Sequence, residues 1–287
     1  MLRAERITGP VTHHGEGPFW DPLNNRLLCV DLLAGTIVAI GDGGVTARFD
    51  VPSPVVSVIR RRRSGGFVIA TERGAVASDD DFSAFEELGE FSRDSNVRTN
   101  DGGCDPMGNF IVGTMAFDER AGGGAVYRLT PDRRVDEILS GVSISNGVQW
   151  SGDGSSAYYI DSPTRRVDVF NVNPQTGAWS GRRTHIRVDG TAGFPDGVAI
   201  DEEGGLWIAL WGGGAVNHYD RRGRLVETIS VSGVSQVSSC AFGGVDRSTL
   251  YITTSRHGLA DGCEPDAGAV FALATGVRGA TPADFCG

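Results

Sequence analysis

The sequence predicts an all-β fold, a six-bladed β-propeller of four-stranded antiparallel blades. Its 42 glycines are spread along the whole chain, and short apolar runs alternate with turn residues. Almost no segment keeps the 3.6-residue period of an amphipathic helix. A similar stretch recurs six times, and its starts lie 41 to 50 residues apart, about the length of one propeller blade.

One repeat illustrates the four strands of a blade. Between residues 196 and 229, three glycine-containing turns separate four short apolar runs. Glycine tolerates the backbone of tight turns, so each connection favours an antiparallel pairing. We expect strands at 198–200, 206–211, 215–219 and 224–229, and a strand at 268–273 in the sixth repeat.

The first strand of every propeller blade lines the central axis, so the residues that open the repeats are expected to face one axial cavity. All six carry a side-chain oxygen. One propeller domain is expected over residues 1–287, in which residues 1–15 supply the outer strand that closes the ring with the last blade. The opening residues are Glu16, Ser57, Asn100, Asn146, Asp196 and Ser239.

Glu16, Asn146 and Asp196 have the carboxylate and amide oxygens that bind hard divalent cations. Each is followed by glycine, which is expected to let the backbone turn sharply at the rim of the channel. Asp-Gly and Asn-Gly pairs are common in ordinary turns, but recurrence at equivalent places in three repeats favours a shared role. A cation would also explain a carboxylate at the start of an apolar strand. The sequence therefore predicts one divalent cation on the axis.

Charge and cysteine content argue against several other classes of protein. The formal net charge is -10 and no basic face recurs, so nucleic acid and anionic membranes are not expected partners. The single basic run, 60–63, precedes Ser64-Gly65-Gly66 and is interpreted as a solvated hairpin turn. The five cysteines are widely spaced without a CxxC pair, so neither a disulfide framework nor a thiolate zinc site is predicted. No signal peptide or long apolar run is present, and a cytoplasmic location is expected.

The histidines and tryptophans of the sequence are expected to have structural roles. Imidazole is not the preferred ligand of a hard oxygen site, so His13 and His14 are expected to be structural although they precede Glu16 closely. The other histidines show no catalytic spacing, and no GxSxG, P-loop or GxGxxG motif opens a helix. Four tryptophans recur at similar places in their repeats and are expected to pack between blades: Trp20, Trp150, Trp207 and Trp211.

Several stretches in this order resemble the senescence marker protein/gluconolactonase/luciferin-regenerating-enzyme family, which includes regucalcin. They are EGPFW at 16–20, NDG at 100–102, DP at 105–106, GTM at 113–115, SNG at 145–147 and FPDG at 194–197. The resemblance covers about residues 16–271. It implies a six-bladed propeller with one divalent metal (Ca, Zn, Mg or Mn) held by Glu16, Asn146 and Asp196, the residues that the repeats also select.

The resemblance also implies a substrate site. Arg98 and Asn100 match the pair that holds substrate in the family, and Asp118 is chosen by spacing over Glu119 as a further acidic contact. The implied activity is metal-dependent hydrolysis of sugar lactones (gluconolactonase-like), with Asp196 as general base acting on water. Arg98 and Asn100 lie in a different repeat from the three ligands, so their loss is expected to leave metal binding nearly intact.

Two alternatives stay open. The first is a metal-dependent hydrolase of a non-sugar lactone or phosphotriester, because the propeller and cation define the reaction type better than the substrate. The second is a non-enzymatic calcium-binding regulatory protein, which the likeness to regucalcin also implies. Neither the identity of the sugar nor the oligomeric state follows from the sequence.

Overall fold

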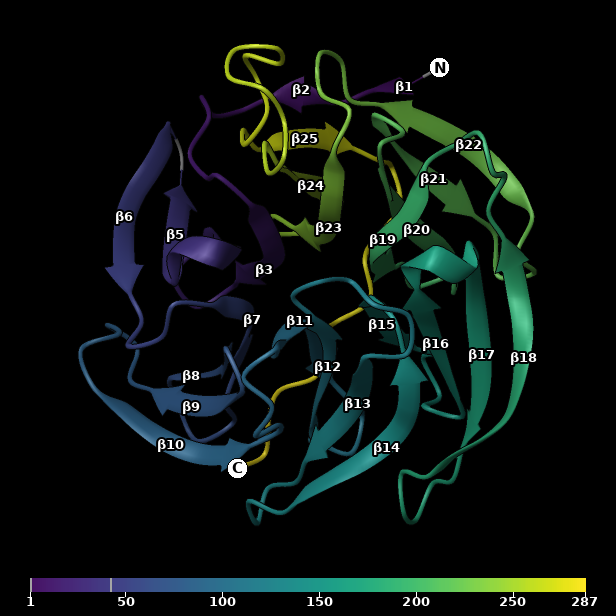
Figure 1. Cartoon of the computed structure of the whole chain (residues 1–287). Coiled ribbons are helices and arrows are strands. Elements are labelled where there is room, and N and C mark those ends of the chain that lie inside the picture. Colours follow the sequence, from purple (N-terminus) through teal and green to yellow (C-terminus); the bar gives the residue numbers. More distant parts are fainter. Residues whose placement is uncertain (1, 42) are drawn as a thin grey trace.

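The computed structural model describes residues 2–41 and 43–287. It confirms the six-bladed propeller, because six antiparallel sheets stand around one axis (Figure 1). The innermost strands contact one another in ring order, and the last contacts the first. They are β3 (Gly15–Asp21), β7 (Val56–Arg61), β11 (Val97–Cys104), β15 (Ser145–Trp150), β19 (Phe194–Ile200) and β23 (Val237–Gly243).

Each sheet continues outward through three further strands in hairpin order. The second strands are β4 (Arg26–Asp31), β8 (Phe67–Thr71), β12 (Phe110–Ala116), β16 (Ser156–Asp161), β20 (Leu206–Trp211) and β24 (Thr249–Thr254). The third strands are β5 (Thr36–Gly41), β9 (Gly74–Ser78), β13 (Gly124–Leu129), β17 (Arg166–Val172), β21 (Ala215–Tyr219) and β25 (Phe271–Ala274). The outer strands are β6 (Gly44–Asp50), β10 (Phe85–Glu90), β14 (Val135–Val142), β18 (Trp179–Arg187) and β22 (Leu225–Ser230), with β2 (Glu5–Arg6) in the sixth blade.

The N-terminal segment joins two blades. Strand β2 pairs antiparallel with β25 of the sixth blade, and β1 (Leu2–Arg3) pairs parallel with β22 of the fifth. These pairings cover two outer edges that open sheets would expose. The helices of the described chain are two short 3-10 turns, η1 (Leu32–Ala34) and η2 (Ser162–Thr164). No helix among the described residues has the length and hydropathy that a membrane crossing requires.

The apolar core is divided among the six interfaces between neighbouring blades, each filled by one cluster of buried side chains. Trp207 shows how such an interface is packed. Its indole is fully buried between the fifth and sixth blades and lies edge to face on Phe242 at 5.5 Å. Its Nε1 donates to Asp201 at 2.9 Å, so the buried polar atom is satisfied.

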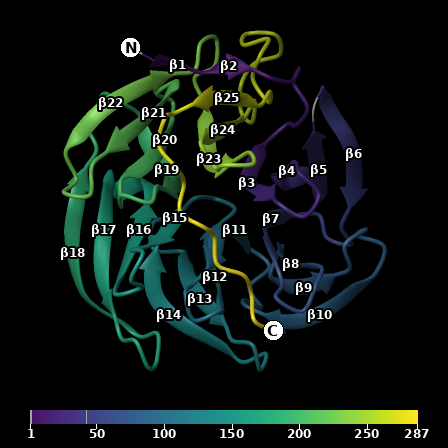
Figure 2. The ribbon, with the colours of Figure 1, turned by 180° about the vertical axis from the view of Figure 1, so that it is seen from behind.

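The chain after β25 crosses the axis on the face opposite to η1 and η2 (Figure 2). Backbone bonds attach this segment to three blades: Ala280 N donates to Ile200 O at 3.0 Å, and Phe285 N to Arg61 O and Cys286 N to Gly108 O at 2.9 Å. The Phe285 side chain is fully buried. One end of the axis is therefore covered by the C-terminal segment.

Every innermost strand shifts its register against the second strand close to its start. A β-bulge of this kind bends the strand and redirects a side chain. In β19 the shift lies between Pro195 and Val198, so the strand begins at Phe194, four residues before the predicted start. In β23 the shift lies between Val237 and Ser239, so Ser238 occupies the bulge and the expected opener Ser239 follows it.

Candidate functional site

The three predicted ligands lie at these register shifts, on the inner strands of the first, fourth and fifth blades. Glu16 lies in β3, Asn146 in β15 and Asp196 in β19, and all three side chains are buried. In each of these three repeats the sequence has a polar residue followed by glycine close to the start of the inner strand. The bulge then keeps that residue within the strand while it breaks the regular alternation of side chains.

Two of the three glycines that follow these residues are required for a steric reason that the sequence did not predict. Gly17 does adopt a positive φ of 51°, in agreement with a sharp turn. Gly147 and Gly197 are not among the residues with positive φ. A Cβ at Gly147 would lie 2.4 Å from Val198 Cγ1, and a Cβ at Gly197 would lie 2.0 Å from Ser239 Oγ. Glycine is required at these two positions because neighbouring blades approach closely.

A chain of hydrogen bonds connects the predicted substrate residues to the predicted ligands. Arg98 Nη1 donates to Asn100 Oδ1 at 2.7 Å, and Asn100 Nδ2 donates to Asn146 Oδ1 at 3.2 Å. Asn146 Nδ2 donates to Ser162 Oγ at 2.7 Å, and the Ser162 hydroxyl donates to Pro195 O at 2.7 Å. These bonds fix the amide of Asn146. Asn100 thus contacts a predicted ligand directly, although it lies in a different repeat.

Burial and repulsion from neighbouring carboxylates dominate the electrostatics of Glu16 and Asp196. Burial, and then the negative charge of Asp101, raise the pKa of Glu16 well above its ordinary value. Burial, and then the charge of Glu16, raise the pKa of Asp196 in the same direction. Burial lowers the pKa of Arg98 to about 10, although the nearby carboxylates favour its charged form. Arg98 therefore stays positive at neutral pH and partly offsets the repulsion.

The residues present fit a divalent cation. Neither Glu16 nor Asp196 forms an ion pair within the described chain, and the one hydrogen bond to the Glu16 carboxylate comes from Gly17 N at 3.2 Å. Two buried carboxylates without an ion-pair partner, together with an oriented amide oxygen, form a donor set suited to a hard cation. The described residues contain no group of three His, Cys, Asp or Glu that could hold a metal, and the predicted set has only two carboxylates besides its amide.

A third buried carboxylate, Asp101, lies next to these residues, and the sequence analysis gave it no role. Its side chain is buried and Oδ1 accepts a hydrogen bond from Gly102 N at 2.7 Å. Burial raises the pKa of Asp101 to about 6. Its charge also contributes to the raised pKa values of both Glu16 and Asp196. Asp101 therefore adds to the negative charge of the site, although it is not one of the predicted metal ligands.

We expect Asp101→Asn to stabilise the metal-free protein relative to the wild type as the pH rises. The pKa of Asp101 is about 6 in the folded chain and near 4 in an unfolded chain. Its contribution to the free energy of unfolding is therefore complete below about pH 4 and is lost as the pH rises through about 6. Asparagine does not titrate, so the difference grows to roughly 2–3 kcal/mol by pH 8. Urea unfolding of both proteins in chelator from pH 4 to 8 measures it, and a constant difference contradicts the assignment.

The structure separates the two acidic candidates of the loop after β12. Asp118 is exposed and pairs with Arg120 at 3.1 Å. Glu119 has a φ of +56°, an uncommon conformation for a residue with a side chain. Its negative charge acts on both Arg98 and His257. The electrostatics therefore connect Glu119, and not Asp118, to the predicted substrate residues.

Three histidines and one tryptophan gather beside the site, where the sequence indicated no function. The buried imidazole of His14 stacks on His257 at 5.4 Å and lies edge to face on Trp211 at 5.6 Å. His13 contacts His257 at 5.8 Å. These residues come from distant parts of the chain, so only the closed ring brings them together.

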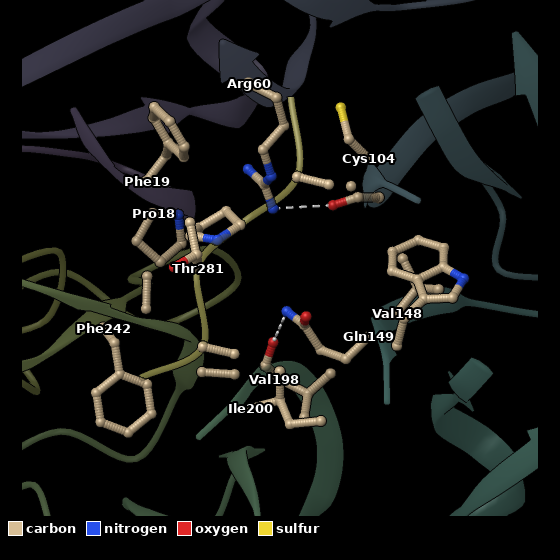
Figure 3. A pocket seen from close by; sticks show the side chains of 18 of the residues that line it. Pro18, Phe19, Arg60, Cys104, Val148, Gln149, Val198, Ile200, Phe242 and Thr281 are labelled. Carbon is tan, nitrogen blue, oxygen red and sulfur yellow. Dashed lines mark hydrogen bonds between the residues drawn. The ribbon is translucent and has the colours of Figure 1, made fainter. Parts of the chain in front are cut away.

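A cavity of about 230 Å³ lies on the axis beyond the site, in the half covered by the C-terminal segment (Figure 3). Of the six opening residues it is lined by Ser239, and most of the other lining residues lie further along the inner strands or in the C-terminal segment, residues 280–283. Arg60 Nη2 donates to Gly102 O at 3.0 Å and Gln149 Nε2 donates to Val198 O at 2.9 Å across it. Asp101 contributes to its lining. The cavity and the predicted ligands therefore occupy successive levels of one axis.

The chain is similar to known proteins over most of its length. Residues 14–256 match the family model described as the SMP-30/gluconolactonase/LRE-like region. Regucalcin of Bos taurus is 37% identical, with 100% of this chain and 99% of the relative covered. A solved luciferin-regenerating enzyme has a TM-score of 0.91 at 31% identity, covering 99% of each chain. Regucalcin of Agrobacterium tumefaciens, described as a calcium-binding protein, has a TM-score of 0.92 at 26% identity and covers 99% of this chain and 97% of that one. The chain belongs to the SMP-30/gluconolactonase/LRE-like family.

Proposed function

We propose that the protein is a metal-dependent lactonase that opens sugar lactones. The observation that carries this proposal is the pair of buried carboxylates, Glu16 and Asp196, that form no ion pair within the described chain and lie beside the oriented amide of Asn146. The family model includes gluconolactonases in its description, which supports lactones as the substrate class. The calcium-binding description of the Agrobacterium relative supports a divalent cation.

Glu16, Asn146 and Asp196 would hold the cation, and each offers one oxygen donor. When bound, a divalent cation supplies Lewis-acid polarisation of the ester carbonyl and acidifies water. Asn146 is suited to this role because Ser162 occupies its amide nitrogen and leaves Oδ1 available. That oxygen accepts from Asn100, and an amide oxygen has a second lone pair.

Asp196 is the proposed general base. Burial and the charge of Glu16 raise its pKa in the metal-free chain, whereas a cation held beside it would lower that pKa, so Asp196 would act on a water that is already acidified. It takes a proton from the attacking water, and this proton reaches the ring oxygen when the carbonyl–oxygen bond breaks. Asp196 follows Pro195, which pairs with Leu210 and accepts a hydrogen bond from the Ser162 hydroxyl through its carbonyl oxygen. The backbone that carries the carboxylate is therefore held in place.

Arg98, Asn100 and Glu119 are the proposed substrate contacts. Arg98 makes its hydrogen bonds to the described residues through Nη1, so Nε and Nη2 are available to ester oxygens. Glu119 is exposed, and its carboxylate can accept a hydrogen bond from a sugar hydroxyl. Of the two acidic candidates, Glu119 has the electrostatic support and Asp118 has the sequence spacing.

The test is a panel of aldonolactones and unsubstituted lactones, assayed with chelator and then with calcium, zinc, magnesium or manganese. The proposal expects hydrolysis of glucono-1,5-lactone that chelator removes and at least one cation restores. Hydrolysis that persists after chelation contradicts the metal role. Calcium binding measured by calorimetry, with no hydrolysis of any lactone, would support the non-enzymatic alternative.

We expect Arg98→Ala and Asn100→Ala to differ in their effect on the cation. Both remove a substrate contact, and we expect kcat/KM for glucono-1,5-lactone to fall about 10²-fold, equivalent to loss of a charge-assisted or paired hydrogen bond in the transition state. Asn100→Ala also removes the donor to Asn146 and is expected to weaken cation affinity several-fold, whereas Arg98→Ala removes a positive charge near the carboxylates and should leave the affinity unchanged or stronger. Calorimetric cation titration of both variants distinguishes them. Equal losses of affinity contradict the hydrogen-bond chain described above.

A further inference from the structure

Trp211 differs from the other tryptophans of the described chain in having no place in the core. Trp20, Trp150, Trp179 and Trp207 each belong to, or pack against, one of the apolar clusters between blades. Trp211 belongs to none of the six clusters and is only half-buried. Its ring contact is with His14. Tryptophan is enriched at binding surfaces because its large apolar ring carries a polar N–H, so a half-buried indole outside the core is a candidate for a ligand contact.

The position of Trp211 brings it close to the proposed base. Trp211 ends β20 and pairs with Phe194 in β19, two residues before Asp196. The next pair joins Leu210 to Pro195. The indole is therefore carried by the strand that pairs with the strand of Asp196, on a rigid part of the fifth blade.

Ser255 holds two imidazoles beside this indole. Its Oγ lies 2.8 Å from His14 Nδ1 and accepts from His257 N at 3.0 Å. Both residues are thus fixed by one hydroxyl, and their rings stack at 5.4 Å. We call His13, His14, Trp211 and His257 the imidazole–indole wall. Within it His14 is buried, whereas His13 and His257 are exposed.

The wall faces the charges of the proposed substrate residues. The positive charge of Arg98 acts on both His14 and His257, and the negative charge of Glu119 acts on both Arg98 and His257. Arg98 and Glu119 come from the third blade, whereas the wall comes from the fifth and sixth blades and the segment before β3. A substrate held by Arg98 near Asp196 therefore lies between these two sides.

We infer that the imidazole–indole wall binds the sugar ring of the lactone, with the C–H face of the ring on Trp211 and a ring hydroxyl at His257. This inference rests on the proposed lactonase function and adds the residues that select a polyhydroxylated ring. The C–H face of a sugar is apolar, so covering it with an indole removes apolar area from water. An imidazole provides both a donor and an acceptor for a hydroxyl.

The test measures binding separately from hydrolysis. D-glucono-1,5-lactam, which resists hydrolysis and keeps the hydroxyls, and δ-valerolactam, which has none, are titrated by calorimetry into the cation-loaded protein. We expect Trp211→Ala to raise the Kd of both lactams, by about tenfold for the gluconolactam, because both rings present a C–H face. His257→Ala should raise the Kd of the gluconolactam about threefold and leave that of δ-valerolactam unchanged. Trp211→Phe keeps an aromatic face and should recover most of the affinity. The matched control is Trp179→Ala, which removes an indole from the cluster between the third and fourth blades.

Each outcome decides the inference. Unchanged affinity of Trp211→Ala for the gluconolactam, no binding by the wild type, or equal weakening of both lactams by His257→Ala overturns the inference. An equal loss of gluconolactam affinity in Trp179→Ala also overturns it, because the effect of Trp211→Ala would then be structural. If the wild type hydrolyses no lactone, loss of gluconolactam binding in Trp211→Ala together with the selective loss in His257→Ala supports the wall and rejects the proposed reaction.

Discussion

Asp196→Asn is expected to reduce hydrolysis of glucono-1,5-lactone by about 10²- to 10⁴-fold in kcat, the range for loss of a general base. Asparagine keeps an oxygen that can face a cation, but it removes the carboxylate that takes a proton from water. We therefore expect that excess cation does not restore activity. The measurement is turnover at saturating cation, corrected for spontaneous opening of the lactone ring.

The matched comparison is Asn146→Ala, because Asn146 is proposed as a ligand without a role in proton transfer. Its loss should weaken cation binding, and saturating cation should restore most of the turnover. The contrast separates ligand from base at two buried positions of the same site. Near-wild-type turnover by Asp196→Asn would assign Asp196 to cation binding alone and place the base elsewhere.

The fold was predictable because a propeller repeats one local pattern. Within the fifth blade, the predicted strands 206–211 and 215–219 coincide with β20 and β21, where glycine turns bound apolar runs on both sides. The start of β19 was not predicted, because a bulge adds residues that the period of an apolar strand does not reveal. Local pattern therefore identified the hairpins, whereas register depended on contacts between strands.

The basic run was interpreted wrongly for a related reason. The sequence predicted a solvated turn at 60–63, but Arg60 and Arg61 belong to β7. Arg61 is buried and pairs with Asp21 at 2.7 Å, and Arg60 lines the axial cavity. Four consecutive arginines indicate solvent exposure only when no acidic partner lies nearby, and Asp21 comes from a different blade.

The same limit on prediction applies to the functional site. Trp20, Trp150 and Trp207 pack between blades as predicted from their repeated positions. Trp211 occupies a similar place in the sequence, yet its strand ends at the site and its ring contacts His14. His14 and His257 are 243 positions apart and meet only because the sixth blade closes on the first. Residue type and spacing identify candidates within one strand, but they do not identify partners that ring closure brings together.

Glu16→Gln is expected to change stability in opposite directions with and without cation. In the metal-free protein, burial raises the pKa of both Glu16 and Asp196, the charge of Glu16 raises that of Asp196 further, and the charge of Asp101 raises both. Removing one charge at pH 8 should therefore increase the free energy of unfolding by about 1 kcal/mol or more. At a cation concentration 100-fold above Kd, the wild type gains about 2.7 kcal/mol. The variant should lose most of that gain.

Urea unfolding at pH 8 with chelator and with calcium measures both effects in one pair of proteins. Glu119→Gln is the matched control, because it makes the same chemical change at an exposed residue outside the proposed ligand set. It should keep the full calcium-dependent gain. A carboxylate that only supports the fold would, when removed, lower the free energy of unfolding under both conditions. A more stable metal-free variant that no longer responds to calcium is the result that a cation ligand requires, because the unpaired charge that destabilises the empty site is the charge that binds the ion.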